Sequence, residues 1–194
     1  MKAIDTYYNG KLFRSRLEAR WAVFFDQCGV SYEYEPEGYD LGDGIWYLPD
    51  FLLHDVVFNH AGYKRGQDLY VEVKGKMSSE DAQKIRLFSQ EKPILVVGEL
   101  PLGEDYQTLC ESMEDAGHAS FEEFNLPEFN FETVDGDYFG AYPGIDLDGY
   151  FNLFGNDSTY LDLMDQRGTV IAYRKARCAR FEYGDSIVKR LRAE

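Results

Sequence analysis

The apolar residues between positions 15 and 35 change from a helical to an alternating spacing, and this change constrains the fold more than any other feature. The helical positions are Leu17, Trp21, Phe24 and Cys28. Ser15 before them and Gly29 after them are residues typical of helix ends. The alternating positions are Val30, Tyr32 and Tyr34, followed by Pro36. A helix that passes directly into a strand predicts a mixed α/β fold.

More strands and a second helix are expected before residue 99. The predicted strands are Trp46–Leu53, Leu69–Lys74 and Pro93–Val97. We expect the last of these to be central in the sheet because it is wholly apolar. The segment between His54 and Gln67 is predicted to be a hairpin turn or loop. A helix capped by Ser78 or Ser79 is predicted next. Its core-facing positions are Ala82, Ile85 and Phe88.

The negative charge of the chain is concentrated in one region. The net charge is −15, but the segment 93–166 holds 17 acids and no Lys or Arg. The rest therefore has 18 of the 35 acids against all 20 basic residues, a balance of +2. This distribution does not exclude a nucleic-acid partner, although phosphate contacts require basic residues. We expect a core domain at 1–99, an acidic, aromatic-rich elaboration of the same domain at 100–166, and a basic helical segment at 167–194 that packs on the core.

The sequence favours a protein of the cytoplasm, either of a cell or of a virus-infected cell. Its apolar runs, such as Trp21–Phe25, are too short to cross a membrane. The N-terminus lacks the pattern of a secretion signal. Three widely separated cysteines, Cys28, Cys110 and Cys178, fit reduced thiols better than disulfides or a zinc site.

Two acids and a lysine form the constellation that carries chemistry. In the strand 69–74 the side chains alternate between faces, so Glu72 and Lys74 emerge together, opposite the apolar positions. Asp50 follows Pro49, and proline in a strand is typical of an edge or a bulge that can re-aim a side chain. Two carboxylates from adjacent strands would make an oxygen-rich site for Mg²⁺ or Mn²⁺.

The pair Pro49-Asp50 followed by Glu72-Val73-Lys74 resembles the signature of the PD-(D/E)XK nuclease superfamily. The similar motifs span residues 13–98, and segments 13–22 and 32–36 also resemble small nuclease-like proteins of bacteria and phages. The tail at 176–182 is similar to the tails of those proteins. The resemblance implies a restriction-endonuclease-like αβββαβ core, with a central mixed sheet flanked by helices and carrying an acidic insertion.

The resemblance also implies an activity, which is divalent-metal-dependent hydrolysis of DNA. Asp50 and Glu72 would bind Mg²⁺ or Mn²⁺ with the backbone carbonyl of Val73, and Glu18 would be a further ligand, directly or through water. Lys74 would position or deprotonate the attacking water and offset charge in the transition state.

A set of basic and polar residues is predicted to contact the DNA. Its members are Arg14, Arg16, Arg20, Lys76, Gln83 or its neighbour Lys84, Arg174, Arg177 and Arg180. A homodimer is compatible with the resemblance, because many relatives pair to cut two strands. The form of the DNA is left open.

Simpler structural roles remain open for these residues. Glu18 can close a capping box with Ser15, Glu72 and Lys74 can be an exposed ion pair worth less than about 1 kcal/mol, and the arginines can be solvated helix residues. Two other function classes also remain. One is a catalytically silent nuclease-fold module whose acidic region imitates DNA or binds a basic protein. The other is a two-carboxylate glycosidase, which leaves Lys74 without a role.

Overall fold

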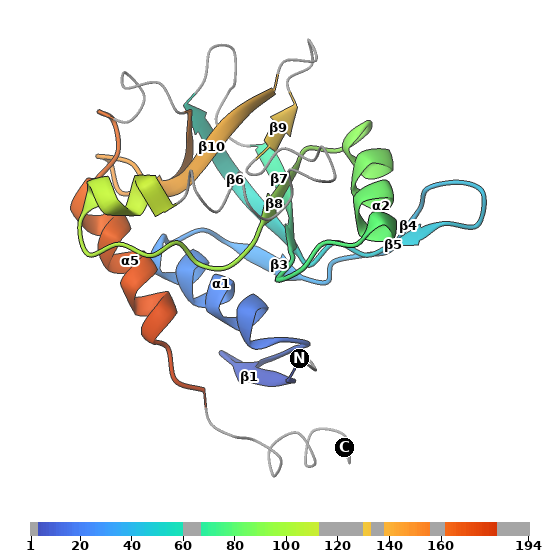
Figure 1. Ribbon diagram of the computed structural model, residues 1–194, viewed down its shortest axis with the longest axis horizontal. Coiled ribbons are helices and arrows are strands. Elements are labelled where there is room, and N and C mark those ends of the chain that lie inside the picture. The colour runs from blue at the N-terminus through green and yellow to red at the C-terminus, as the bar shows by residue number, and fades with distance from the viewer. Residues whose placement is uncertain (1–3, 60–66, 113–129, 133–137, 156–161, 182–194) are drawn as a thin grey trace.

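The protein has an α/β fold in which helices cover both faces of a mixed, curled central sheet (Figure 1). The computed structural model describes residues 4–59, 67–112, 130–132, 138–155 and 162–181. Within those ranges no helix combines the length and the apolar character that a bilayer span requires.

The first half of the chain alternates short strands with two helices. Its elements are β1 (Thr6–Tyr8), β2 (Lys11–Phe13), α1 (Arg16–Gln27), β3 (Tyr32–Tyr34), β4 (Tyr39–Asp40), β5 (Trp46–Tyr47), β6 (Phe51–Asn59), β7 (Gln67–Val73), α2 (Ser79–Ser89) and β8 (Ile94–Val97).

The second half adds strands and one long helix. Residues 106–112 are helical. The other elements are β9 (Asn130–Glu132), β10 (Tyr138–Ile145), β11 (Phe151–Gly155) and α5 (Gln166–Cys178). The helix predicted in the basic segment 167–194 is α5, which ends at Cys178, and the predicted remainder of that segment from 182 to 194 lies outside the described residues.

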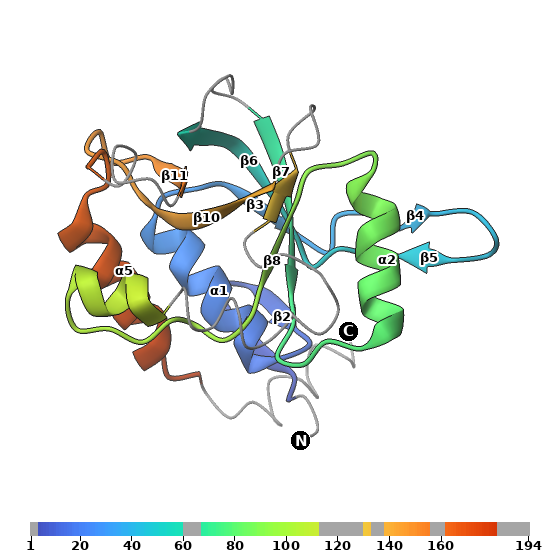
Figure 2. The ribbon, with the colours of Figure 1, turned by 45° about the horizontal axis from the view of Figure 1, so that its top comes forward.

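The main sheet joins strands from both halves of the chain. Its order is β8-β7-β6-β11-β10-β9, and β3 also pairs with β6. The β6–β7 and β10–β11 pairs are antiparallel, whereas β7–β8 and β6–β11 are parallel. Among the described residues, the acidic elaboration at 100–166 therefore contributes three strands, β9, β10 and β11, to the same sheet. Strands β8 and β9, at the two ends of this order, also contact each other, so the sheet curls (Figure 2).

Two strand predictions are corrected in extent. The strand expected at Trp46–Leu53 is two strands, because β5 pairs with β4 in a separate ribbon and β6 begins only after Pro49. The expected loop after His54 is strand as far as Asn59. A bulge at Asp55, with φ of +57°, interrupts the local alternation, and the strand is then continued by pairing with β11, about 95 residues away in sequence.

The expected central position of the strand at 93–97 is wrong. Among the described strands, β8 ends the sheet order and pairs with β7 alone. It is wholly apolar because both of its faces are covered. Leu95 and Val97 join the core on the α1 side, and Ile94 and Val96 join the core beneath α2.

The sheet thus separates two hydrophobic cores. The larger core lies under α1 and α5, where the rings of Phe24 and Tyr173 stack with centroids 4.1 Å apart. The smaller core lies under α2 and includes Tyr47 and Phe88. The predicted helix signals are confirmed, because Ser15 caps α1, Gly29 follows it with φ of +66°, and Ser78 caps α2 in a capping box with Asp81.

Candidate active site

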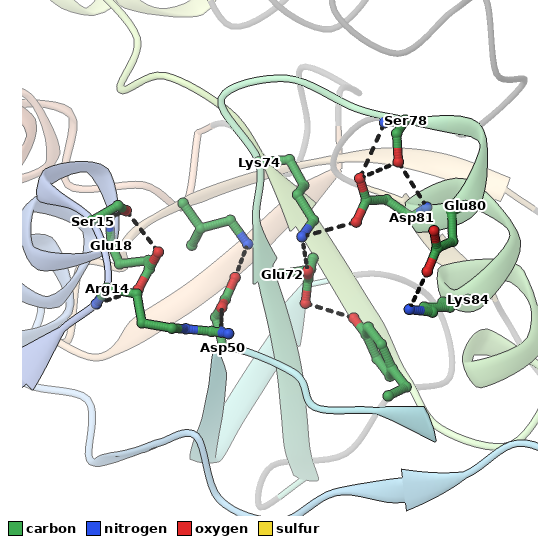
Figure 3. Close-up of polar contacts among 12 residues, drawn as sticks. Arg14, Ser15, Glu18, Asp50, Glu72, Lys74, Ser78, Glu80, Asp81 and Lys84 are labelled. Atoms are coloured by element: carbon green, nitrogen blue, oxygen red, sulfur yellow. Dashed lines mark hydrogen bonds and ion pairs between the residues drawn. The ribbon is translucent and has the colours of Figure 1, made fainter. Parts of the chain in front are cut away.

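Asp50 lies where the pairing of β6 with β7 ends. Successive backbone N–H groups of a strand point alternately to its two neighbours. The N–H groups of Tyr70 and Lys74 point to β8, so the N–H of Val73 points toward β6. Val73 lies beyond Val71, the last residue of β7 that pairs with β6 at this end. Asp50 Oδ2 accepts this N–H at 2.8 Å (Figure 3). The carboxylate therefore replaces a missing ladder carbonyl, and its side chain is 3% exposed.

Glu72 and Lys74 lie together on the α2 side of β7, as the strand alternation predicts. Lys74 Nζ is 2.7 Å from Glu72 Oε1 and 3.2 Å from Asp81 Oδ1. The Tyr47 hydroxyl donates to Glu72 Oε2 at 2.6 Å. The apolar residues of the strand, Leu69, Val71 and Val73, enter the larger core. Glu72 is 2% exposed, so its charge is neutralised by protein groups and not by solvent.

Arg14 joins the start of α1 to Asp50. Its Nη2 is 2.8 Å from Asp50 Oδ1, and its Nε is 2.7 Å from Glu35 Oε1. Glu35 is itself held beside Asp50, because its backbone N–H donates to the Asp50 carbonyl at 2.9 Å. The guanidinium therefore lies between two carboxylates, and its side chain is 55% exposed.

Glu18 has the contacts of a helix-capping residue. Ser15 Oγ accepts the Glu18 N–H at 3.1 Å and donates to Glu18 Oε1 at 2.7 Å. Glu18 Oε2 accepts the Tyr34 hydroxyl at 2.6 Å and the Arg14 N–H at 3.1 Å. These contacts fix the carboxylate at the N-terminal end of α1, where the helix dipole favours negative charge.

The three buried acids repel one another. Burial, together with the negative charges of Glu72 and Glu18, raises the pKa of Asp50 to about 8, against the opposing effects of the Val73 N–H and Lys74. The site therefore carries more negative charge than its environment can solvate.

Lys74 stays protonated in this arrangement. Burial alone would lower the pKa of its ammonium, but Glu72, Asp50 and Asp81 outweigh that effect and raise it above the usual value. The pKa of Tyr47 is also raised, first by burial and then by the charge of Glu72, so its hydroxyl keeps the proton that it donates.

The oxygen donors of Asp50, Glu72 and Glu18 suit a hard divalent cation such as Mg²⁺ or Mn²⁺, and the repulsion among them is what a cation would relieve. In the described ranges no three or more His, Cys, Asp or Glu side chains are already grouped to hold a metal ion. Arg14 and Lys74 take up the oxygens instead, so a cation would have to displace them.

Of the residues predicted to contact DNA, Arg14 contacts the site directly. Lys76 is exposed two residues after Lys74, and Gln83 is exposed on α2. Lys84, named beside Gln83, forms an ion pair with Glu80 on the same helix at 2.7 Å. Arg16 and Arg20 lie in the first half of α1 and are partly buried.

The predicted basic residues of α5 are not brought to this site. Both ribbon views place α5 beyond α1 from α2 (Figures 1 and 2). Arg177 donates to the carbonyls of Pro101 and Gly103, which is a structural role. Arg174 is exposed on α5, and Arg180, also exposed, lies beyond the end of that helix.

Sequence reasoning missed several partners of the site, namely Tyr47, Tyr34, Glu35 and Asp81. Asp81 had a visible signal, since it stands three residues after Ser78 in the capping-box spacing. The others could not be found from local spacing, because their contacts join different strands and helices.

A scan against protein-family models and a search of curated proteins gave no match to this chain.

Proposed function

We propose that the protein is a divalent-metal-dependent nuclease of the PD-(D/E)XK type that hydrolyses DNA phosphodiester bonds. One observation carries this proposal. Asp50 and Glu72, both almost fully buried, come from the ends of adjacent strands, and the Lys74 ammonium contacts Glu72. Burying two carboxylates costs several kcal/mol that packing alone does not require, and such costs are typical of functional sites.

The arrangement of the elements supports the family resemblance. Apart from the separate β4–β5 ribbon between β3 and β6, the elements follow the αβββαβ order that the resemblance implies, as α1, β3, β6, β7, α2 and β8. The β6–β7 pair is antiparallel and the β7–β8 pair is parallel, with α2 as the crossover. This order puts the acid before β6 beside the acid-x-lysine triplet of β7.

In the proposed enzyme, Asp50 and Glu72 hold the cation, with the Val73 carbonyl and Glu18 as the further predicted ligands. The bound cation supplies polarisation of the scissile phosphate and a water of lowered pKa. Lys74, which contacts Glu72 beside the cation position, positions or deprotonates the attacking water and offsets negative charge in the transition state. Asp81 keeps the ammonium in place from the first turn of α2.

The test is a panel of labelled duplex, branched and single-stranded DNA, with an RNA arm, incubated with Mg²⁺ or Mn²⁺. We expect cleavage of at least one DNA form and a loss of at least about a hundredfold in Asp50→Asn and Lys74→Ala. Arg167→Gln, at an exposed position in the first turn of α5, is the matched control and should cleave as the wild type does. Cleavage that survives both site substitutions would reject this site.

A second candidate function is a catalytically silent binding module that uses the acidic region. It is favoured by the saturation of the site, because Asp50 and Glu72 both already have protein donors. This candidate predicts that Mn²⁺ leaves the thermal stability unchanged in the wild type and in Asp50→Asn alike. The nuclease predicts a rise in melting temperature with Mn²⁺ that Asp50→Asn removes.

A further inference from the structure

The Arg14 guanidinium occupies the side of Asp50 that the protein backbone leaves open. Asp50 Oδ2 accepts the Val73 N–H, and Oδ1 is in contact with Arg14 Nη2 at 2.8 Å. A cation that binds Asp50 through Oδ1 therefore meets Arg14 first (Figure 3).

The contacts of Arg14 allow its head group to leave without disturbing the fold. Its backbone N–H is fixed by Glu18 and Tyr34 at 3.1 and 3.0 Å. The side chain is 55% exposed, in contrast to the buried Asp50. Glu35 holds the other edge of the guanidinium at 2.7 Å. If Asp50 exchanged the guanidinium for a metal ion, Glu35 would still neutralise Arg14 at the edge of the site.

Charge explains why such a residue is present. Without a positive group at Oδ1, Asp50 would be a buried carboxylate close to Glu72 and Glu18, which costs several kcal/mol. Lys74 neutralises Glu72, with which it forms an ion pair. Arg14 therefore stabilises the metal-free protein at the position where a divalent cation would act in the metal-bound protein.

We propose that Arg14 is a displaceable counter-ion of Asp50, which competes with the divalent cation and sets the metal affinity of the site. This proposal rests on the proposed metal-dependent function. Its consequence is that removal of the guanidinium strengthens metal binding while it weakens the metal-free fold. A residue with only a structural role would weaken the fold without strengthening metal binding.

The experiment is a Mg²⁺ titration of the full chain, followed by thermal unfolding, for the wild type, Arg14→Gln, Arg14→Lys and Arg174→Gln. The apparent Kd follows from the rise in stability with Mg²⁺ concentration. Arg174→Gln makes the same change in net charge at an exposed position on α5.

We expect Arg14→Gln to lower the apparent Kd about tenfold and to melt earlier than the wild type without Mg²⁺. Arg174→Gln should leave the Kd unchanged. Arg14→Lys should fall between Arg14→Gln and the wild type, because an ammonium lacks the planar fork that contacts Asp50 and Glu35 together. Circular dichroism before heating checks that each variant is folded.

The outcomes separate this proposal from the proposed function. If the wild type binds Mg²⁺ and Arg14→Gln binds equally or more weakly, Arg14 is not a competitor, while the metal-dependent function stands. An equal gain in affinity in Arg174→Gln would also overturn the proposal, since net charge alone would explain it. If neither the wild type nor Arg14→Gln responds to Mg²⁺, both the proposed function and this inference are rejected.

Discussion

At the scale of single residues, the site is defined by acids that the fold keeps out of water. Asp50 and Glu72 are 3% and 2% exposed, and each is satisfied by a strong donor from another element. Identical residue types on the surface would have ordinary ionisation behaviour. The raised pKa of Asp50 is therefore a consequence of its position where the pairing of β6 with β7 ends.

Asp50 should make metal-free stability fall as the pH rises. Its folded-state pKa is about 8, whereas an aspartate in the unfolded chain titrates at about 4. Between these values the folded protein binds one more proton than the unfolded chain. The stability contributed by this residue is thus full below about pH 4 and is lost as the pH approaches 8. The Asn side chain of the Asp50→Asn variant cannot ionise, so this variant does not lose that stability as the pH rises.

Urea unfolding in EDTA at about pH 5 and pH 8 measures this effect. The stability of Asp50→Asn relative to the wild type should increase by on the order of 1–3 kcal/mol between the two conditions. Asp105→Asn is a suitable control, because the pKa of the exposed Asp105 is lowered by its hydrogen bonds to Thr108. Its stability relative to the wild type should stay constant over that range. A constant difference for Asp50→Asn as well would show that Asp50 is ionised throughout.

At the scale of elements, the first turn of α2 serves both the helix and the site. Asp81 completes the capping box with Ser78 and also contacts Lys74. Burial would raise the pKa of Asp81, but Ser78 and Lys74 outweigh it and lower the pKa below the usual value. Asp81 therefore links the Lys74 ammonium to the N-terminus of α2, and in the proposed nuclease it would be a positioning residue.

Two substitutions separate the roles of this turn. Ser78→Ala removes the cap and should cost about 1 kcal/mol of stability, with the cleavage rate close to that of the wild type. Asp81→Asn keeps an acceptor for the cap but removes a charge from Lys74, so we expect a rate loss of about tenfold. An unchanged cleavage rate in Asp81→Asn would limit Asp81 to the helix cap.

At the scale of the whole molecule, the C-terminal helix completes the core that supports the site. Tyr173 of α5 is fully buried, stacks on Phe24 of α1, and donates to the Pro143 carbonyl of β10 at 2.9 Å. α1 in turn carries Arg14 and Glu18 at its N-terminal end. Residues far apart in sequence thus share one packed unit.

Tyr173→Ala should therefore destabilise the protein by about 3–5 kcal/mol, through a large cavity and a lost hydrogen bond. The control is Lys175→Ala on the same helix, whose exposed ammonium contacts only Gln27 in the described contacts and should change stability by less than about 0.5 kcal/mol. Urea unfolding followed by tryptophan fluorescence and by circular dichroism measures both. Tyr173→Ala with near wild-type stability would show that α5 does not support the core.

The sequence predicted the parts of this protein that depend on neighbours in the chain. Both helices of the first half, their caps and the inward face of β7 follow from spacings of two to four residues, because such short periods determine which side chains share a face. The pairing of Glu72 with Lys74 follows for the same reason.

Only the tertiary structure decided what depends on distant pairing. The extension of β6 to Asn59 needs β11, the edge position of β8 needs the whole sheet order, and the contact between Arg14 and Asp50 joins α1 to the start of β6. These contacts depend on which elements meet in space, and local periodicity carries no information about that choice. The acids could thus be identified from the sequence. Their burial, their repulsion and the basic side chains that neutralise them could be recognised only in the tertiary structure.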